Sequence, residues 1–243
     1  MFKIRRFPKI LLSVSTIGLI ISIFSLFFRD KWLFGALCLF VSFAIYLVYL
    51  LSYDYKASHL MQLAKKHLDR NEVVKAVDCM LTSARLNANE ENLVRIFGQQ
   101  RKNLDTFKAA SAKLYEKMDA SDTPFVRFLI GSFFYFAGDI QKTKELLTAI
   151  PVEERSIKTV RLLGSALYDM KDYDGAIEVL SQYDSASLPT NENELAVVFG
   201  LGIAYLSKGD KATASEYLLK VQTRNPRFGN VSQILATMND KAD

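Results

Sequence analysis

Apolar and polar positions divide this chain into two parts of different character. Near the N-terminus, residues 10–28 form a run of 19 without a charge and residues 32–53 a run of 22, separated only by Arg29, Asp30 and Lys31. At about 1.5 Å per helical residue, each run is long enough to cross a hydrocarbon layer of about 30 Å. The pattern predicts a membrane anchor over residues 1–53, with two transmembrane helices at about 10–28 and 32–53 joined by a tight hairpin.

From residue 54 to 243 the apolar spacing is helical, without strand signals of any length, so the fold class predicted is all-α. This part of the chain repeats itself. Leu163–Leu180 and Leu201–Leu218 both begin with Leu-Gly, have an Ala 12 residues after the Gly and end with a Leu four residues later. A small residue recurs along the domain at spacings of 34, 33, 33 and 38, at Ala64, Gly98, Gly131, Gly164 and Gly202. Such a period predicts repeated helix pairs.

A single helix pair cannot bury its own apolar faces, so neighbouring pairs stack into a superhelix. The small residue lets the first helix of each pair lie close to the second. We expect five units, at about 57–88, 91–120, 124–152, 157–187 and 194–226. A capping helix at about 229–240 follows, and its apolar side consists of Val231, Ile234, Leu235 and Met238.

This pattern resembles the tetratricopeptide repeat (TPR) family, whose units are helix-turn-helix pairs. The last unit carries the most family positions, at Leu201, Gly202, Tyr205, Gly209, Ala214 and Pro226. The resemblance extends over about residues 54–228 and implies a right-handed superhelical array of about five helix pairs. It also implies a protein-binding scaffold or adaptor that recruits a partner through a concave groove, without enzymatic activity.

In the family, the concave groove is lined by side chains of the first helix of each unit. Carried onto this chain, the resemblance implies a lining of Asn92, Arg95, Gln99, Lys102 and Asn103, then Phe125, Phe128, Ser132, Tyr135 and Phe136, then Lys158, Arg161, Ser165, Tyr168 and Asp169. Arginine and aromatic side chains suit an extended acidic peptide, because Arg binds carboxylate through two parallel hydrogen bonds. The alternative is that these are solvated polar residues and aromatic residues that pack between units.

Charge is distributed unevenly along the chain. Residues 1–53 contain six basic side chains and one acidic one, whereas the remaining 190 residues contain 25 of each. The sequence pI of about 9.0 therefore belongs to the apolar N-terminal part, and we expect no nucleic-acid partner. Basic residues before the first run and after the second predict, by the positive-inside rule, a multi-pass protein of the cell membrane, with both termini and the repeat domain in the cytoplasm. A cleaved signal peptide is the alternative, but the end of the first run lacks the small residues of a cleavage site.

Small residues recur every three or four positions in both apolar runs, at Ser15, Gly18, Ser22 and Ser25 and at Gly35, Cys38 and Ser42. Such stripes permit close contact between helices in lipid. They serve either to pack the two runs against each other or to receive a partner's helix. The second possibility makes the protein an accessory subunit of a membrane enzyme, transporter or cell-envelope machine, and the layout is similar to that of bacterial membrane-anchored repeat proteins.

Residues with catalytic or cofactor chemistry form no convincing constellation. His59 and His67 lack further ligands at metal-site spacing, and Gly200–Gly202 lacks the third glycine of a dinucleotide loop. Cys38 and Cys79 are not expected to meet in a disulfide. We therefore expect no catalytic residue, metal, cofactor or small-molecule substrate, and the oligomeric state stays open.

The stretch from Tyr49 to Met61 connects the apolar part to the repeat domain. Gly and Pro are absent between Gly35 and Gly98, which predicts one unbroken helix from the second apolar run to about Arg70. Tyrosines 46, 49, 53 and 55 would then form an interfacial belt. This arrangement predicts a rigid strut that holds the array at a fixed angle to the membrane.

Overall fold

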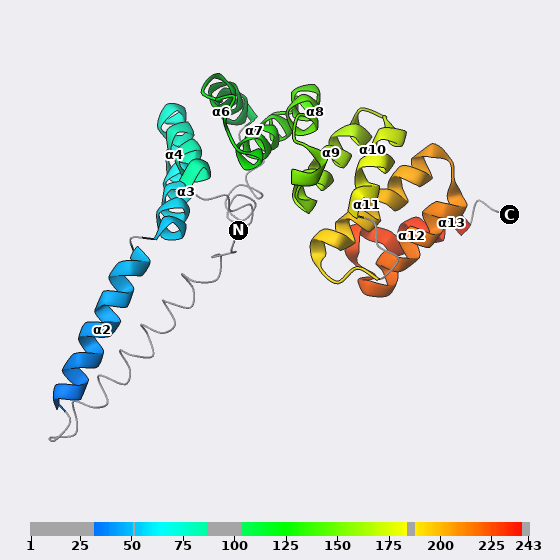
Figure 1. Ribbon diagram of the computed structural model, residues 1–243. Helices are drawn as coiled ribbons and strands as arrows, with labels where there is room; N and C mark the ends of the chain where they lie inside the picture. The colour runs from blue at the N-terminus through cyan, green and yellow to red at the C-terminus, as the bar shows by residue number, and fades with distance from the viewer. Residues whose placement is uncertain (1–31, 51, 87–103, 184–187, 240–243) are drawn as a thin grey trace. The chain divides into compact units, whose positions relative to one another are not determined.

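The structure is a computed structural model that describes residues 32–50, 52–86, 104–183 and 188–239. The chain divides into two compact units, Met1–Gln99 and Gln100–Asp243, and each is considered by itself. In the described residues the fold is entirely helical, with eleven α-helices and no strand (Figure 1). The predicted all-α class is confirmed for this part of the chain.

The first unit contains α2 (Trp32–Leu50), α3 (Tyr53–Asp69) and α4 (Val73–Leu86). Helices α3 and α4 pack as a pair. The buried positions of α3 are three or four residues apart and so share one face: Ala57, Met61, Ala64 and Leu68. The hydroxyl of Ser83 on α4 donates a 2.6 Å hydrogen bond to the carbonyl of Ala57 on α3. Small residues at this contact allow the two helices to approach closely.

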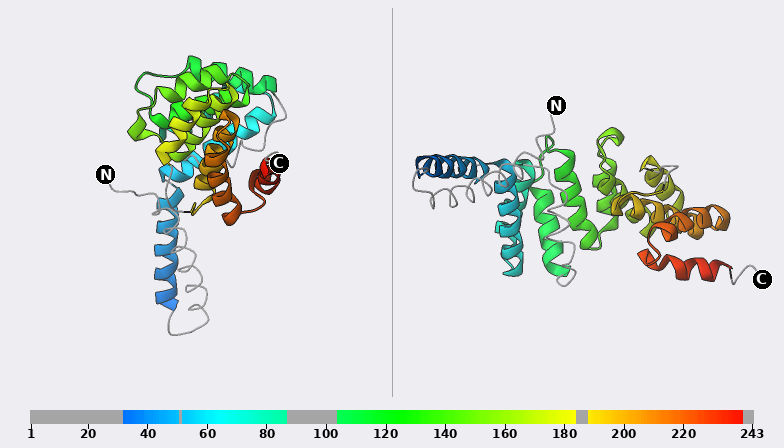
Figure 2. Two further views of the ribbon diagram at one scale, coloured as in Figure 1. Left: turned by 90° about the vertical axis from the view of Figure 1, so that its right-hand side faces the viewer. Right: turned by 90° about the horizontal axis from the view of Figure 1, so that it is seen from below.

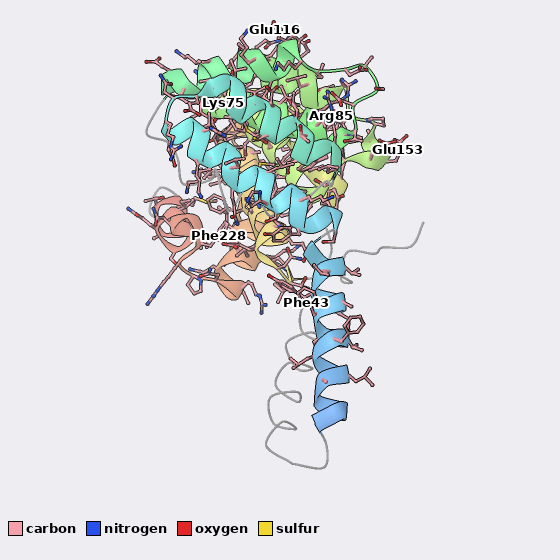
Figure 3. All side chains as sticks on the ribbon, turned by 90° about the vertical axis from the view of Figure 1, so that its left-hand side faces the viewer. Phe43, Lys75, Arg85, Glu116, Glu153 and Phe228 are labelled. Atoms are coloured by element: carbon pink, nitrogen blue, oxygen red, sulfur yellow. The ribbon has the colours of Figure 1, made fainter. Side chains whose placement is uncertain are left out.

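The prediction of one continuous helix through residues 49–61 is wrong. Helix α2 ends at Leu50 and α3 begins at Tyr53. Between them Ser52 adopts an extended conformation (φ −64°, ψ 146°), and its hydroxyl accepts a hydrogen bond from the Tyr55 amide. Serine is among the best N-cap residues because its side chain replaces a missing backbone partner. A helix can therefore end and restart without Gly or Pro, and α3 does not continue the direction of α2 (Figure 3).

The first predicted membrane helix, with Ser15, Gly18 and Ser22, lies outside the described residues. Gly35, Cys38 and Ser42 of the second small-residue stripe are on α2, where the Ser42 side chain is buried. In the part of the chain that the structure describes, no helix combines the length and the apolar character needed to cross a membrane.

The second unit contains a succession of helices that pack in chain order (Figure 1). They are α6 (Leu104–Glu116), α7 (Pro124–Phe136), α8 (Ile140–Thr148), α9 (Ile157–Asp169), α10 (Tyr173–Leu180), α11 (Glu192–Lys208) and α12 (Lys211–Arg224), followed by α13 (Val231–Asn239). Short 3-10 turns occur at Val152–Glu154, Ser181–Tyr183 and Phe228–Asn230. Helices α7/α8, α9/α10 and α11/α12 are the three complete pairs of this unit.

Each complete pair of the second unit is closed by a glycine opposite a leucine. A Cβ atom added to Gly131, Gly164 or Gly202 would lie 2.9, 2.6 or 2.8 Å from a methyl carbon of Leu147, Leu180 or Leu218, respectively. These leucines are 16 residues after their glycines, at the end of the repeated motif. The recurring small residue therefore marks the closest contact between the two helices, as the sequence predicted.

The turn inside each pair is equally regular. One residue adopts a positive φ angle, at Asn71, Gly138, Lys171 and Gly209. In the three complete pairs of the second unit the next residue is an aspartate whose carboxylate caps the second helix: Asp139, Asp172 and Asp210. An acidic residue at this position suits the positive end of the helix dipole.

Helix α13 lies beside α12 and covers the last pair (Figure 2). Val231 and Leu235 are buried against α11 and α12, and Ile234 and Met238 pack beside them. Ser232, Gln233 and Thr237 on the opposite side are exposed. The helix thus places an apolar side on the core and a polar side outward, as predicted for a cap.

Candidate functional site

A pocket of about 400 Å³ opens on the second unit between α9 and α11. We refer to it as the α9–α11 pocket. Five of its residues come from α9 and four from α11, and the rest come from α7, α10 and the turn after α12. The lining consists of Tyr135, Arg161, Gly164, Ser165, Tyr168, Asp169, Leu180, Ala196, Phe199, Gly200, Ile203 and Phe228.

Four of the lining residues on α9 and α11 are small. Gly164 and Ser165 lie on α9, and Ala196 and Gly200 lie on α11. Leu180 of α10 fills the space beside the two glycines, because its methyl carbons would lie 2.6 Å from a Cβ atom at Gly164 and 3.1 Å from one at Gly200. Leu180, Phe199 and Ile203 supply apolar walls.

Phe228 forms the wall that comes from the turn after α12. Its ring contacts Phe199 edge-on, with 5.5 Å between the ring centroids. The next residue, Gly229, has φ +54°, and a Cβ atom there would lie 2.5 Å from the Phe199 ring. A glycine is needed here because the backbone passes so close to the aromatic ring.

Arg161 supplies the positive charge of the pocket. Its guanidinium is partly buried and donates a hydrogen bond to the side-chain oxygen of Asn193, and it forms no ion pair with any residue that the structure describes. Burial lowers the pKa of Arg161, and the negative charge of Glu192 opposes that shift. An arginine keeps its charge even so. A partly buried cation with only a neutral direct partner attracts an anionic group.

Two tyrosines tie successive helix pairs together at the other end of the pocket. Tyr135 of α7 donates a 2.9 Å hydrogen bond to the carboxylate of Asp169, and Tyr168 of α9 shares a 2.9 Å hydrogen bond with the Ser207 hydroxyl. Both tyrosines are four residues after the glycine of their own pair. The same contact is thus repeated from one pair to the next and holds α7, α9 and α11 in register.

The structure brings some of the predicted groove residues together and separates others. Tyr135, Arg161 and Tyr168, with Ser165 and Asp169, line one pocket. Asn92, Arg95, Gln99 and Lys102 lie outside the described residues. Lys158 is on α9 but is not part of the lining.

The aromatic residues predicted for the third unit mostly serve packing. Phe128 is 4% exposed and contacts Phe125, with 6.3 Å between ring centroids, and the Ser132 hydroxyl donates to the Phe128 carbonyl. Phe136 packs edge-on against Phe107 of α6. Phe128 is therefore unavailable to a ligand in this conformation, in agreement with the alternative that these aromatics pack between units.

The sequence analysis missed the apolar wall on α11. Ala196, Phe199 and Ile203 lie six residues before, three before and one after Gly202. These are the same positions, relative to the glycine, that selected Lys158, Arg161 and Ser165 around Gly164. The same three positions around Gly202 therefore predict Ala196, Phe199 and Ile203 as lining residues. Phe228 has no such signal, because it follows the second helix of the last pair and reaches the pocket only through the turn.

Side chains suited to binding a metal ion are not gathered in the described residues. No group of three or more His, Cys, Asp and Glu there could hold a metal ion. The ring of His67 instead contacts the Glu72 carboxylate at 2.6 Å, within the turn between α3 and α4. Burial raises the pKa of the Cys79 thiol, which makes it less reactive.

Comparison with protein families identifies a repeat in the second unit. Residues 196–228 match the tetratricopeptide repeat, a span that includes most of α11, all of α12 and Phe228. A repeat of this kind suggests a scaffold for protein–protein interaction, and the family is in general non-enzymatic. A comparison with curated proteins finds no match.

Proposed function

We propose that this protein is a membrane-anchored scaffold that binds a segment of a partner protein in the α9–α11 pocket. The observation that carries the proposal is Arg161, a partly buried cation whose only direct partner among the described residues is an amide oxygen. Partner proteins are the natural ligands to expect, because the helix pair on one side of the pocket matches a protein-interaction repeat.

The chemistry of the pocket favours an acidic peptide with an apolar side chain nearby. A carboxylate of the peptide binds the guanidinium of Arg161 through charge-assisted hydrogen bonds. The apolar side chain packs against Phe199 and Ile203, and the volume of about 400 Å³ is within the usual range for ligand pockets. Arg161 and Asp169 are eight residues apart on α9, which is about 12 Å along the helix. An extended peptide of about four residues spans a similar distance, at about 3.3 Å per residue.

The apolar N-terminal part provides the membrane anchor in this proposal, and the repeat domain lies on the cytoplasmic side. The uncharged runs at 10–28 and 32–53 support it, together with the apolar side chains that α2 exposes. Leu37, Phe40 and Phe43 are 60, 71 and 59% exposed, and Phe43 projects outward from α2 (Figure 3). Exposed apolar patches of this kind are typical of surfaces that meet a membrane or a partner.

Peptide selection with the full-length protein tests the binding proposal. The protein, purified in detergent and immobilised, is screened against a random peptide library, and the affinities of enriched peptides are then measured for variants. Enriched sequences are expected to combine Asp or Glu with a Phe, Leu or Ile nearby.

Two substitutions test the pocket itself. Arg161→Gln keeps a polar side chain beside Asn193 but removes the charge, and should weaken binding of the selected peptides roughly 10- to 100-fold. Ser165→Trp fills the mouth of the pocket from an exposed position and should abolish binding. Gln141→Trp, on the exposed side of α8, is the matched control and should bind as the wild type does. Unchanged binding by both pocket variants would refute the proposal.

The accessory-subunit hypothesis predicts a different result for Ser165→Trp and for a substitution on α2. If the apolar part makes the main contact, Ser165→Trp still co-purifies with its membrane partner, whereas substitution of Ser42 by Leu on α2 prevents it. This pair of variants separates the two roles.

A further inference from the structure

One exposed side of α3 is basic. Lys56, His59 and Lys66 of α3 and Arg70, the residue that caps its C-terminus, fall within about 80° of one another at 100° per residue. They lie opposite the buried positions Ala57, Met61, Ala64 and Leu68, on the side of the helix that does not face α4. Lys56, His59, Lys66 and Arg70 are named here the basic face of α3.

Within the described residues, no neighbour forms an ion pair with the lysines and the arginine of the basic face. Lys56, Lys66 and Arg70 form no ion pair with any residue in the described part of the chain. Lys75 on α4, by contrast, lies 3.3 Å from the Glu72 carboxylate. Between Tyr55 and Arg70 the sequence has a single acidic residue, Asp69. The face therefore carries a net positive charge that is open to an anionic partner.

The position of the basic face in the chain identifies that partner. Helix α3 follows directly after α2, whose exposed side chains include Phe43, Leu47 and Val48. The extended backbone at Ser52 turns α3 away from the direction of α2. Tyr55, 37% exposed, stacks on His59 at the start of the face, with 6.2 Å between ring centroids. In membrane proteins, apolar side chains lie in the hydrocarbon layer, tyrosines lie at its edge and lysines lie among the headgroups. The chain from α2 to α3 has its side chains in this order.

We propose that the basic face of α3 lies on the anionic headgroups of the membrane in which the N-terminal part is anchored. The proposal rests on the membrane anchoring put forward under the proposed function. Anionic lipids attract cationic side chains near the surface, by roughly fivefold in affinity for each Lys or Arg. Nucleic acid is the less favoured anionic partner, because the adjoining α2 exposes an apolar surface. Contact with headgroups fixes the first helix pair against the bilayer.

Chemical labelling of lysines in the full-length protein tests this contact. The protein is reconstituted into vesicles of phosphatidylcholine alone and of phosphatidylcholine mixed with phosphatidylglycerol. An amine-reactive reagent is added, and the modification of each lysine is measured by mass spectrometry. Lys56 and Lys66 should be labelled several-fold more slowly in the vesicles that contain phosphatidylglycerol, whereas Lys171 in the second unit should react equally in both.

Salt and a charge-matched variant complete the test. Raising the ionic strength should restore labelling of Lys56 and Lys66, because exposed charges are screened. A protein with Lys66→Glu and Arg70→Glu should lose the protection of Lys56. The control with Lys108→Glu and Lys171→Glu has the same net charge and should keep it.

The outcomes separate this inference from the function on which it rests. If the chain stays with both kinds of vesicle but Lys56 and Lys66 react equally in them, the headgroup contact is refuted and the anchor is not. If the chain stays with neither kind, the anchor and the headgroup contact are both overturned. Protection that survives high salt would also refute contact with anionic headgroups.

Discussion

The helix pairs α9/α10 and α11/α12 have nearly the same local architecture but differ in the residue at the turn. In both, a glycine faces a leucine, Gly164 against Leu180 and Gly202 against Leu218. In both, an aspartate caps the second helix through a backbone amide at 3.1 Å. The residue before that aspartate has a positive φ in each pair, 62° at Lys171 and 95° at Gly209.

The difference shows that the turn conformation is imposed by the helices and the cap. Glycine adopts positive φ readily, whereas an L-residue with a side chain is strained there by about 1–2 kcal/mol. Lys171 nevertheless has a positive φ, and the two turns make the same backbone hydrogen bond: the Asp172 amide donates to the Leu167 carbonyl at 2.9 Å, as the Asp210 amide donates to the Tyr205 carbonyl at 3.0 Å. Of these two pairs, only α11/α12, which has the glycine, falls mostly within the residues that match the repeat family.

The glycine contacts should be the most sensitive feature of both pairs. Gly164→Ala places a Cβ atom 2.6 and 2.7 Å from Cδ2 and Cγ of Leu180, and Cγ cannot move away by rotation of the side-chain tip. We expect it to lower the free energy of unfolding by about 2 kcal/mol, since overpacking outweighs the better helix propensity of alanine. Gly202→Ala, at 2.8 Å from both atoms of Leu218, should be somewhat milder.

Urea unfolding followed by far-UV circular dichroism measures both changes. Ser165→Ala, on the exposed side of α9 next to Gly164, is the control and should be close to neutral. A Gly164→Ala protein as stable as the wild type would show that the close approach of the two helices is not required.

The two turn residues should respond to substitution in opposite directions. Gly209→Ala meets no atom within 4 Å, so only the positive φ angle matters, and we expect a loss of about 1 kcal/mol. Lys171→Gly relieves the same strain and should raise the free energy of unfolding by about 0.5 kcal/mol, because part of the gain is offset by the greater freedom of glycine in the unfolded chain. Urea unfolding measures the free energy of unfolding of the two variants. If both variants are more stable or both less stable than the wild type, the idea that the two turns share one strained backbone conformation is contradicted.

The smallest effect concerns the pH dependence of the α11/α12 cap. Hydrogen bonds from the side chain and amide of Thr213 lower the pKa of Asp210 below its ordinary value. A carboxyl group whose pKa is lowered in the folded state stabilises the fold above its unfolded-state pKa of about 3.9, and that contribution is lost as the pH falls through the folded-state pKa. Asp210→Asn should therefore show a slightly shallower fall of Tm with acidification. Parallel Tm curves for the two proteins would argue against this role of the carboxylate.

Much of the architecture could be predicted from the sequence because the repeat signals act locally. The glycine, the alanine or threonine 12 residues on and the leucine after it locate each complete pair of the second unit. Thr143 stands where the other two pairs have an alanine. Its buried hydroxyl group is accommodated because it donates to the carbonyls of Asp139 and Gly131. The prediction of a continuous helix through Ser52 is wrong, because a serine N-cap can separate two helices where Gly and Pro are absent.

The candidate site was predicted in part. The position of Arg161, Tyr135 and Tyr168 relative to a glycine predicts that they line the groove, and that position depends on helix geometry alone. The same spacing predicts Phe128 as a groove residue, but its large apolar side chain is buried and packs against Phe125. Burial depends on neighbours that the local pattern does not specify.

The sequence by itself determined the all-helical fold of the described residues, the positions of the helix pairs and the small residues at their contacts, since each follows from spacing within one turn or one repeat. The tertiary structure alone decided that Phe228 closes the pocket and that Arg161 has an amide as its direct partner. It also decided that Lys171 adopts a left-handed turn. These features depend on contacts between residues distant in the chain, and packing free energy selects them over local preference.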